Sequence, residues 1–296
     1  MLHKTRNLVE DWRKGDAEKL AVFEMEADTA WPGGGGWQTT ADEQEREIRE
    51  SNLLGAFVTE NERRIVSICT IRAKPGQKAH AFIPYLNCHP EYHGKKHGKS
   101  VLQAALDRAC EAGFQRVDLY TWSGNLKAVP LYKKTGFMWR PDSAVHMENF
   151  TPAARRHPLA AVFFARHDWY DTQVRKLELE EDVMTRGKVK VYEYLWRAPD
   201  GDFLRLVFDR QSWGIIEIEN GDLSASCSLC DEKLVAGVPH PVRWRIVNKK
   251  PHPVRVSLTA SGDPGVEVEM RETLEVADAA ELEGTFAIDP DIQEKT

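Results

Sequence analysis

The stretch HPEYHGKKHGKSVLQAAL, from His89 to Leu106, joins the end of a predicted strand to the start of a predicted helix. Its first part contains three histidines, three lysines and two glycines, and its last part is apolar. A helix that begins directly after such a loop leaves its first four amides without intrahelical acceptors, and its dipole attracts anions. The order of strand, loop and helix therefore indicates a phosphate site, with a solvated, basic helix start as the alternative.

The loop HGKKHGKS does not fit the phosphate-binding templates that can be read from sequence. The GxxxxGK[ST] pattern requires a glycine five residues before Gly98, where this chain has His93, and the GxGxxG pattern also fails. Gly94 and Gly98 would still let the backbone approach a ligand closely, and the lysines would add positive charge at the rim. We expect the helix to run from about Lys99 to Ala112, because Gly113 is a typical C-terminal glycine.

Residues 1–150 alternate between helical and strand patterns, which predicts an α+β domain. Helices are expected over residues 16–28 and directly after Thr40, whose hydroxyl can cap a helix start. The WPGGGGWQTT stretch between them is a loop by composition. Strand patterns follow at LLGAFVTE, IVSICTIRA, AHAFIPYLNCHP, VDLYTW, FMWRP and AVHMENF.

The second half of the chain has a different pattern. Residues 151–182 are expected to form a connecting segment, with a helix that starts at Thr151-Pro152 and continues through LAAVFFARHDWY. Over residues 183–296, alternating runs separated by turn signals predict an all-β domain with the strand spacing of a β-sandwich. The sequence therefore predicts two domains, residues 1–150 and 183–296.

Composition narrows the classes of function. The net charge of -6 and the sequence pI of about 6.0 argue against nucleic-acid binding. No apolar run is long enough for a membrane helix, and the N-terminal residues lack the apolar core of a secretory signal. Five cysteines do not form a disulfide framework in a chain of 296 residues, so we expect reduced thiols and a cytoplasmic protein.

Two motifs in residues 1–150 resemble those of the GNAT N-acetyltransferase family. In the first, Cys88-His89-Pro90 and Gly98 match the strand end and the last glycine of the acetyl-CoA motif, with His93 at its Gln or Arg position. Lys96 departs from that motif, because it stands where the family usually has a glycine. The second motif, residues 117–137, resembles N-x-x-A-x-x-L-Y-x-x-x-G-F. The resemblance implies a GNAT-like mixed sheet flanked by helices, followed by the all-β domain.

The resemblance also implies a reaction, in which an acetyl group passes from acetyl-CoA to an amine by direct attack in a ternary complex. The amine must be neutral to attack, so a base or a water chain has to take its proton. Tyr132 stands at the position of the family's general acid, and a phenol is a suitable proton donor to a thiolate; a packed aromatic ring is the alternative. The residues implied to bind the cofactor are Leu86, Asn87, Cys88, Gly94, Lys95, Lys96, His97, Gly98, Lys99 and Asn125.

The sequence does not single out one general base or one form of the acceptor pocket. The WPGGGGW loop lies where the family often places its acceptor-binding loop, and Trp31 and Trp37 could shape the pocket. Its four glycines fit either a mobile lid or a plain connector. The candidate bases, each of which could equally be a solvent-facing or a core residue, are Glu24, Glu26, Glu45, Tyr85 and Tyr120.

No metal site is predicted. Cys227 and Cys230 form a CxxC pair, but their spacing to His240 and His252 fits no zinc-finger template. The three histidines of the opening stretch lie beside the matched loop and are better explained as solvated side chains.

The leading hypothesis is an N-acetyltransferase that acts on a primary amine of a small molecule, peptide or protein. The alternative is a non-catalytic CoA-binding sensor or scaffold whose C-terminal domain binds a partner. That domain resembles an immunoglobulin-like module by pattern, and it could narrow the acceptor site, bind a partner or form a homodimer. No nucleic-acid or membrane partner is expected.

Overall fold

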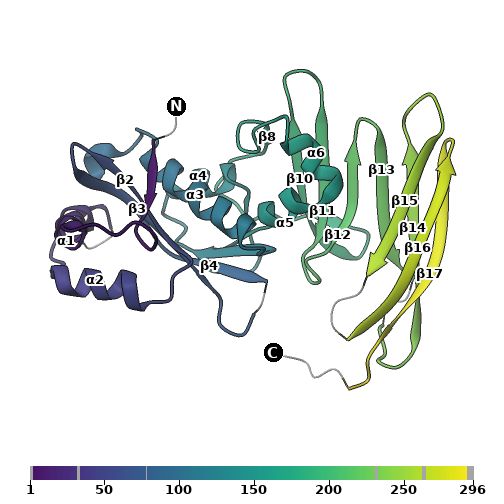
Figure 1. Cartoon of the computed structure of the whole chain (residues 1–296), viewed down its shortest axis with the longest axis horizontal. Coiled ribbons are helices and arrows are strands. Elements are labelled where there is room, and N and C mark those ends of the chain that lie inside the picture. The colour runs from purple at the N-terminus through teal and green to yellow at the C-terminus, as the bar shows by residue number, and fades with distance from the viewer. Residues whose placement is uncertain (1–2, 32–33, 78, 231–232, 262–264, 292–296) are drawn as a thin grey trace. The chain divides into compact units, whose positions relative to one another are not determined.

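The computed structural model of the chain describes residues 3–31, 34–77, 79–230, 233–261 and 265–291 (Figure 1). The chain divides into two compact units, of which unit 1 comprises Met1–Ala161 and Lys176–Val183. Unit 2 comprises Val162–Arg175 and Met184–Thr296. The segment over residues 151–182 is therefore shared between the two units. None of the helices in the described part of the chain has the length and apolar character that a membrane crossing requires.

Unit 1 contains the predicted mixed sheet, with strand order β1-β2-β3-β4-β5-β7-β6. Among the described residues of unit 1, only the pairing between β4 and β5 is parallel. The short edge strand β1, which the sequence did not predict, pairs with β2. The strands are β1 (Thr5–Asn7), β2 (Gly55–Asn61), β3 (Arg64–Ala73), β4 (His80–Cys88), β5 (Arg116–Tyr120), β6 (Phe137–Trp139) and β7 (His146–Asn149).

The helices follow the predicted order, with two differences. α3 starts at His97, two residues earlier than expected, and ends before Gly113, which has a φ of 84°. The single helix predicted after Thr151 is two short helices, because Pro158 favours an extended conformation at the residue before it. The helices are α1 (Asp16–Ala27), η1 (Asp28–Ala30), α2 (Ala41–Glu50), η2 (Pro90–Tyr92), α3 (His97–Glu111), α4 (Ala128–Lys134), α5 (Thr151–Arg156) and α6 (Pro158–Phe164).

The cap predicted for the second helix is confirmed. The hydroxyl of Thr40 accepts a hydrogen bond from the Glu43 amide at 3.3 Å, and the Glu43 carboxylate accepts one from the Thr40 amide at 2.9 Å. This reciprocal pair satisfies two amides that the helix start would leave without partners.

The central strands of unit 1 are buried on both faces. Ala56, Val58 and Ile68 pack on the face covered by α1 and α2, in one apolar cluster with Leu20 and Phe23 of α1. On the opposite face, the hydroxyl of Thr59 lies 2.9 Å from the imidazole of His97 in α3. The sheet therefore separates two helical layers, and residues that alternate along β4 face different layers.

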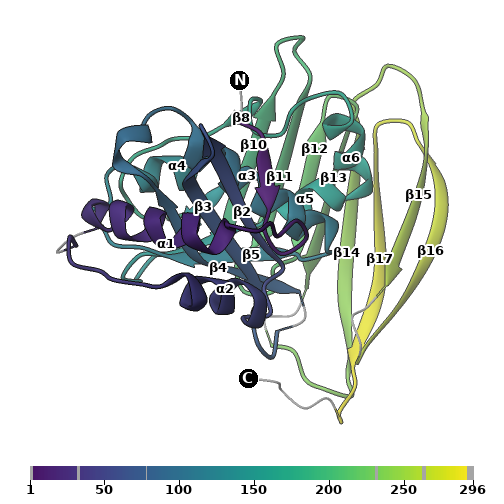
Figure 2. The same ribbon diagram turned by 60° about the vertical axis from the view of Figure 1, so that its left-hand side comes forward.

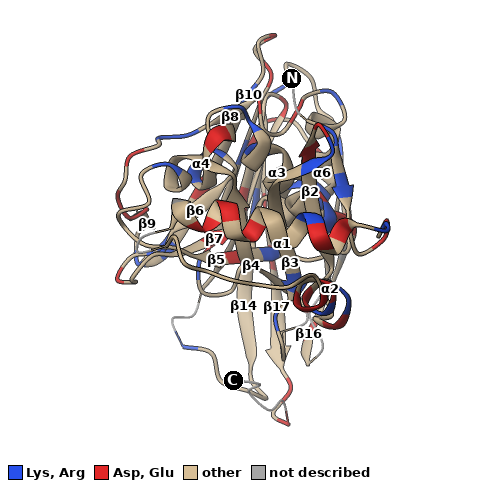
Figure 3. Cartoon of the chain, turned by 90° about the vertical axis from the view of Figure 1, so that its left-hand side faces the viewer, with Lys and Arg blue, Asp and Glu red and all other residues tan. Residues whose placement is uncertain are grey.

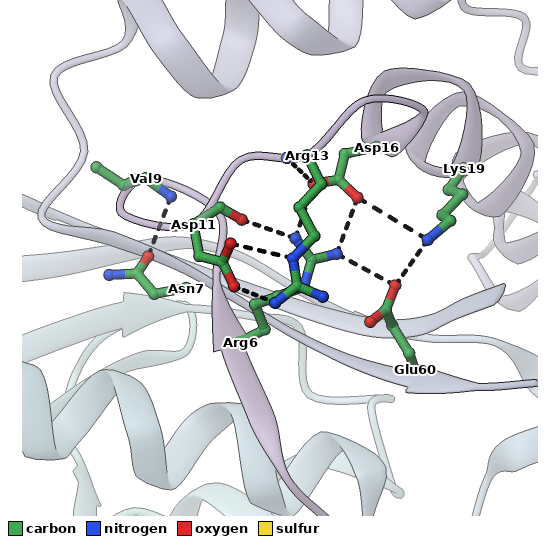
Figure 4. Close-up of polar contacts among 8 residues, drawn as sticks. All are labelled: Arg6, Asn7, Val9, Asp11, Arg13, Asp16, Lys19 and Glu60. Carbon is green, nitrogen blue, oxygen red and sulfur yellow. Dashed lines mark hydrogen bonds and ion pairs between the residues drawn. The ribbon is translucent and has the colours of Figure 1, made fainter. Parts of the chain in front are cut away.

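An ion-pair network fixes the start of α1 to the sheet (Figure 4). Asp16, the first residue of α1, is fully buried and accepts two hydrogen bonds from Arg6 of β1, at 2.7 and 2.8 Å. Arg6 also contacts Glu60 of β2 at 3.1 Å, and Lys19 contacts the same carboxylate at 3.0 Å. Buried charges are tolerated when they are paired in this way. The network positions α1, and with it Glu24 two turns further on.

Unit 2 confirms the prediction of a C-terminal region of antiparallel strands. Of the ten strands among the described residues of unit 2, nine follow one hydrogen-bonded path, β15-β16-β17-β14-β13-β12-β11-β10-β8, and β9 pairs with β10 off that path. They are β8 (Gln173–Val174), β9 (Thr185–Arg186), β10 (Val189–Arg197), β11 (Phe203–Asp209), β12 (Ile215–Asn220), β13 (Leu223–Leu229), β14 (Pro239–Asn248), β15 (Val254–Ser261), β16 (Val266–Val276) and β17 (Ala279–Ile288).

The last strands of unit 2 do not continue as one regular ladder. β16 pairs with β17 over only three residues, Val266–Val268, and then pairs with β15 (Figure 2). Gly284 of β17 lies close to Trp244 of β14 and Met270 of β16, and a Cβ at this position would be 2.9 and 3.2 Å from their side chains. A glycine is therefore required where these three strands pack closely.

Candidate active site

The strands β4 and β5 diverge in the middle of the sheet of unit 1. They pair in parallel only over His80–Phe82 and Arg116–Asp118. Beyond Phe82, β4 continues to Cys88, whereas β5 ends at Tyr120. This divergence opens the sheet at the C-terminal part of β4, immediately before the loop that leads to α3.

The loop between β4 and α3 places glycine and lysine at the start of a helix. Gly94 and Lys96 both have left-handed backbone conformations, with φ of 75° and 69°. A Cβ at Gly98 would lie 3.9 Å from the side chains of Cys88 and Leu131, so this glycine packs close to β4 and α4. The loop therefore brings the amides at the start of α3 beside the end of β4.

His93 and Cys88 connect this loop to β4. His93 Nε2 donates to the carbonyl of Cys88 at 2.8 Å, and its Nδ1 lies 3.4 Å from Nζ of Lys127. Burial raises the pKa of the Cys88 thiol to about 11, and a hydrogen bond from the Gly98 amide opposes the rise. His93 thus holds the end of β4 against the loop.

On the other face of β4, a carboxyl group is hydrogen-bonded to a phenol. Tyr85 donates to Glu24 Oε2 of α1 at 2.6 Å and accepts from the Asn87 side chain at 2.9 Å. Burial raises the pKa of Glu24 to about 7; the hydrogen bond from Tyr85 opposes this rise, and the charges of Glu47 and Asp28 add to it. A carboxyl group that titrates near neutral pH can accept a proton under physiological conditions.

Two tryptophan rings lie next to the Glu24–Tyr85 pair. The ring of Trp31, directly after η1, is nearly parallel to that of Tyr85, with centroids 6.1 Å apart. Trp122, which follows β5, lies 5.5 Å from Trp31 at an interplanar angle of 41°. Both tryptophans remain more than one third exposed. The exposed rings form an aromatic surface beside the carboxyl group of Glu24.

The glycine-rich loop after η1 is held by Asp28. Its Oδ2 accepts hydrogen bonds from the amides of Gly35, Gly36 and Trp37, at 2.6, 3.0 and 3.0 Å. A Cβ at Gly34 would be 1.9 Å from the Asp28 carbonyl oxygen, so only glycine fits there. The described part of the loop has a defined, anchored conformation next to Trp31; the predicted position of Gly33 lies outside the described residues.

Tyr132 of α4 is almost entirely buried, with 6% of its surface exposed. Its ring packs edge-to-face on Phe137 at 5.9 Å, and burial raises its pKa well above the ordinary value for tyrosine. Within the described residues, its hydroxyl has no hydrogen-bond partner. The hydroxyl therefore stays protonated at neutral pH and can donate to a ligand.

The model of the acetyltransferase (GNAT) family matches residues 20–137 of this chain. Residues 20–137 form a GNAT acetyltransferase domain. The match spans α1 to β6, so the diverging strands, the α3 loop, Glu24 and Tyr132 all lie within the GNAT domain or at its edge. Domains of this family are acyltransferases that act on amine acceptors. Among curated proteins, none matches the chain.

Several solved structures of acetyltransferases match about half of the chain. One is the PaiA N-acetyltransferase of Thermoplasma acidophilum in complex with coenzyme A, with 21% identity and a TM-score of 0.37, covering 51% of this chain and 99% of that one. Another is the ribosomal-protein-S18-alanine N-acetyltransferase of Escherichia coli, with 14% identity, a TM-score of 0.37 and coverages of 50% and 93%. YncA of Salmonella typhimurium, a putative acetyltransferase with acetyl-CoA, has 17% identity, a TM-score of 0.40 and the same coverages.

Most of the predicted cofactor residues of the GNAT domain lie together, but the two asparagines do not join them. Leu86, Cys88 and the loop from Gly94 to Lys99 lie together at the end of β4 and the start of α3. Asn87 is different, because its side chain contacts Tyr85 on the opposite face. Asn125 is hydrogen-bonded within its own loop, to Thr121 at 3.0 Å and to the Ala128 amide at 3.2 Å.

The side chain of His97, another predicted cofactor residue, does not face the proposed cofactor site. Its side chain is buried against β2, so only its backbone amide is available to a phosphate.

Among the candidate bases, the structure brings Glu24 and Tyr85 together. Glu26 instead pairs with Arg64, and Glu45 pairs with Arg49 on the exposed side of α2. Trp122 was not selected from the sequence, although its position directly after a predicted strand is a usable signal.

A buried charged cluster lies beside the point where β4 and β5 diverge. Asp118 accepts hydrogen bonds from Arg116 at 2.7 Å and lies 2.7 Å from His146 and 2.9 Å from His80. Burial alone would raise the pKa of Asp118, but these partners hold it far below its usual range. Asp118, His146 and Glu148 form the one group with metal-site geometry among the described residues. Arg116 lies 3.3 Å from Glu148, so an arginine already neutralises these carboxylates.

His240, one of the two histidines considered and rejected as zinc ligands beside the CxxC pair, contacts the backbone of unit 2 instead. His240 is buried, and its imidazole contacts the backbone of Val235 at 2.8 to 3.0 Å. Cys227 lies on β13 and Cys230 is exposed just beyond that strand.

Proposed function

We propose that the GNAT domain binds acetyl-CoA at the α3 loop and transfers the acetyl group to a primary amine by direct attack, with Glu24 as the general base. The observation that carries this proposal is the Glu24–Tyr85 pair, in which burial raises the pKa of Glu24 to about 7. The pair lies on one face of β4, and Cys88 faces the α3 loop on the other. One strand thus has the base on one side and the cofactor loop on the other.

The residues at the α3 start fit a pyrophosphate group. The start of α3 supplies backbone amides and the positive end of the helix dipole. The Gly98 amide donates to the Cys88 thiol, Gly98 packs close to β4, and Lys96 is exposed. We assign cofactor binding to Leu86, Asn87, Cys88, the loop Gly94 to Lys99, and Asn125. The Cys88 backbone is already bonded to Asn87 Oδ1 and to His93, so Cys88 would share these hydrogen bonds with the pantetheine arm. Acetyl-CoA supplies an acetyl group that its thioester activates.

Glu24 and Tyr132 are assigned opposite proton transfers. Glu24 takes the proton that the amine must lose before or during attack, and the Tyr85 hydroxyl orients its carboxylate. Tyr132, buried and protonated, donates to the sulfur that leaves the carbonyl carbon. An ammonium acceptor loses two protons, one before attack and one as the amide forms. The thiolate gains one proton through Tyr132, and the other leaves Glu24 to solvent, so each turnover releases one proton, the acetyl amide and the CoA thiol.

The acceptor is proposed to be an amine that binds as a cation before it loses its proton. The rings of Trp31, Tyr85 and Trp122 can attract an ammonium group through their electron-rich faces. The helices α1 and α2 carry nine acidic and three basic side chains, and Figure 3 shows the acidic residues at both ends of α1. This charge favours a cationic acceptor over one with a carboxylate next to its amine.

A non-catalytic CoA sensor is the rival proposal. The experiment that separates the two uses the purified full chain, acetyl-CoA and a panel of amines: alkyl diamines, a lysine-containing peptide, an aromatic amine and free amino acids. Release of the CoA thiol is followed together with the mass of the acetylated product. Acetylation of the cationic amines supports the transferase. Binding of acetyl-CoA with no product across the panel supports the sensor, and failure to bind acetyl-CoA contradicts both.

The domain boundaries, the oligomeric state and the cellular location are also proposals. We retain residues 1–150 as the transferase domain, residues 151–182 as the connecting segment and residues 183–296 as the all-β domain. A homodimer through the all-β domain predicts twice the chain mass in sedimentation. A cytoplasmic location predicts that all five thiols react with a maleimide when the protein is denatured immediately on release from cells, because the buried Cys69 is accessible only in the unfolded chain.

A further inference from the structure

Lys96 has a backbone conformation that side-chain-bearing residues seldom adopt. It precedes α3 with φ 69° and ψ 7°, in the left-handed region. For an L-residue this conformation brings Cβ close to the following carbonyl, so glycine is usually found there. Some other part of the structure must therefore hold Lys96 in place.

His3, at the N-terminal side of β1, contacts the chain on both sides of Lys96. Its Nε2 donates to the carbonyl of Lys95 at 2.7 Å, and its backbone amide donates to the hydroxyl of Ser100 at 3.0 Å. Its ring stacks on that of His97, with centroids 3.6 Å apart and an interplanar angle of 11°. One residue thus contacts the positions immediately before and after Lys96.

The residues that His3 contacts are themselves fixed to the sheet. His97 Nδ1 lies 2.9 Å from the hydroxyl of Thr59 in β2, and that hydroxyl lies 2.6 Å from Ser67 in β3. Tyr92 packs edge-on against the His97 ring at 5.5 Å, and Lys95 Nζ lies 4.8 Å from the centre of the Tyr92 ring. The stack of His3 on His97 therefore rests on a buried, hydrogen-bonded base.

We propose that His3 is a positioning residue for the cofactor loop, and that it holds Lys96 in the left-handed conformation in which the loop binds acetyl-CoA. The inference rests on the proposed function, because it assumes that the α3 loop receives the pyrophosphate. It explains how this chain keeps a lysine where a glycine would adopt the conformation without strain. The lysine in return places an exposed cation at the helix start.

Loss of the contacts should weaken cofactor binding and leave the chemistry unchanged. Without His3, the Lys95–Lys96 segment can relax, and acetyl-CoA has to reorder it on binding. His3→Ala removes one hydrogen bond to a carbonyl and one ring stack, which together correspond to a loss of at least about fivefold in affinity. We expect KM for acetyl-CoA to rise by this factor and kcat at saturating acetyl-CoA to stay within about twofold, because His3 touches no residue to which we assign a proton transfer.

The test combines calorimetric Kd values for CoA with steady-state kinetics on the full chain. His252→Ala is the matched control, since His252 is an exposed histidine of unit 2, and it should change neither quantity. His3→Phe keeps the ring but loses the hydrogen bond to Lys95, so its Kd should lie between those of the wild type and His3→Ala. A fall in kcat with an unchanged Kd would overturn the positioning role.

A second variant tests the link to Lys96 directly. In a Lys96→Gly background the left-handed conformation no longer needs support, so His3→Ala should weaken CoA binding by less than about twofold. An equal loss in both backgrounds would show that His3 acts by some other route.

Amide exchange without cofactor separates failure of this inference from failure of the proposed function. In the absence of CoA, His3→Ala should speed amide exchange over residues 94–100 relative to the wild type. If the wild type does not bind CoA but exchange still rises in the variant, the proposed function is wrong and the positioning of the loop stands. If CoA binds and exchange is unchanged, only the inference is wrong.

Discussion

Replacing Glu24 by glutamine removes the proposed base with little change in shape. The Tyr85 hydroxyl, now 2.6 Å from the carboxylate, can donate to the amide oxygen instead. A positioned general base contributes about 10²- to 10⁴-fold to a proton transfer. We therefore expect kcat to fall by at least about 100-fold, while the Kd for CoA stays within about twofold because Glu24 lies on the other face of β4.

The pH dependence gives the prediction a second readout. Only the ionised carboxylate can accept a proton, so the wild-type rate should fall as the pH drops below about 7, the pKa to which burial raises Glu24. The rate kcat is measured at saturating amine and at pH values well below the pKa of an alkylamine, so that the acceptor is cationic throughout and its own titration does not contribute. The glutamine variant should lack this acidic limb in its residual activity.

Stability should change in the opposite direction from activity. The pKa of Glu24 is higher in the folded protein than in the unfolded chain, whose value is the ordinary 4.5. Its contribution to stability is therefore fully present below pH 4.5 and is lost as the pH rises through about 7. Each pKa unit corresponds to about 1.4 kcal/mol, so Glu24→Gln should be more stable than the wild type by up to about 3 kcal/mol at pH 8.

Urea unfolding at pH 4 and pH 8, beside the pH–rate profile, completes the assay. An inactive variant that is at least as stable as the wild type at pH 8 cannot owe its loss of activity to misfolding. Wild-type kinetics in Glu24→Gln, or an acidic limb that persists in it, would refute the assignment of the base.

The remaining predictions concern the proposed acid, the acceptor surface and the anchor of α1. Tyr132→Phe should lower kcat about 100-fold with an unchanged Kd for CoA and unchanged stability, since no described residue bonds to its hydroxyl; a large loss of stability would favour a packing role. Trp122→Ala should raise the KM of cationic amines about three- to thirtyfold and leave the KM for acetyl-CoA unchanged, as expected for a cation–π contact of about 0.5–2 kcal/mol; a matching rise for neutral amines would contradict it. Burial would raise the pKa of Asp16, but hydrogen bonds from Arg6 and the Arg13 amide hold it below its ordinary value. Asp16→Asn should therefore cost about 3 kcal/mol in urea unfolding at pH 7. The cost should shrink as the pH falls and the wild-type carboxylate is protonated; a cost that does not change with pH would be inconsistent with an ion pair.

Local signals in the sequence were sufficient for much of unit 1. The cap at Thr40, the helix end at Gly113 and the loop at Gly94 depend on residues close in sequence, and each is found where it was expected, whereas Gly98 lies in the first turn of α3. The start of α3 was predicted two residues late, because Lys96 takes a conformation that its residue type does not suggest. β1 has three polar residues and no apolar alternation, so only its pairing with β2 identifies it.

The choice among the candidate bases required the tertiary structure. Glu24 and Glu26 are two residues apart on α1, but one contacts Tyr85 and the other Arg64. Their different roles depend on which residues of β3 and β4 lie opposite, and a β-bulge between Thr70 and Arg72 shifts that register. In unit 2, alternation predicted strands but not their order, because pairing joins residues far apart in the chain.

A crystal structure of the chain with CoA would test the central claim most directly. We predict that the pyrophosphate contacts the amides between Gly94 and Lys99 and that the sulfur lies within hydrogen-bond distance of the Tyr132 hydroxyl. We further predict that the Glu24 carboxylate faces the open side of the sulfur. CoA bound away from the α3 loop, or with its sulfur on the side of α3 remote from Tyr132, would contradict the account.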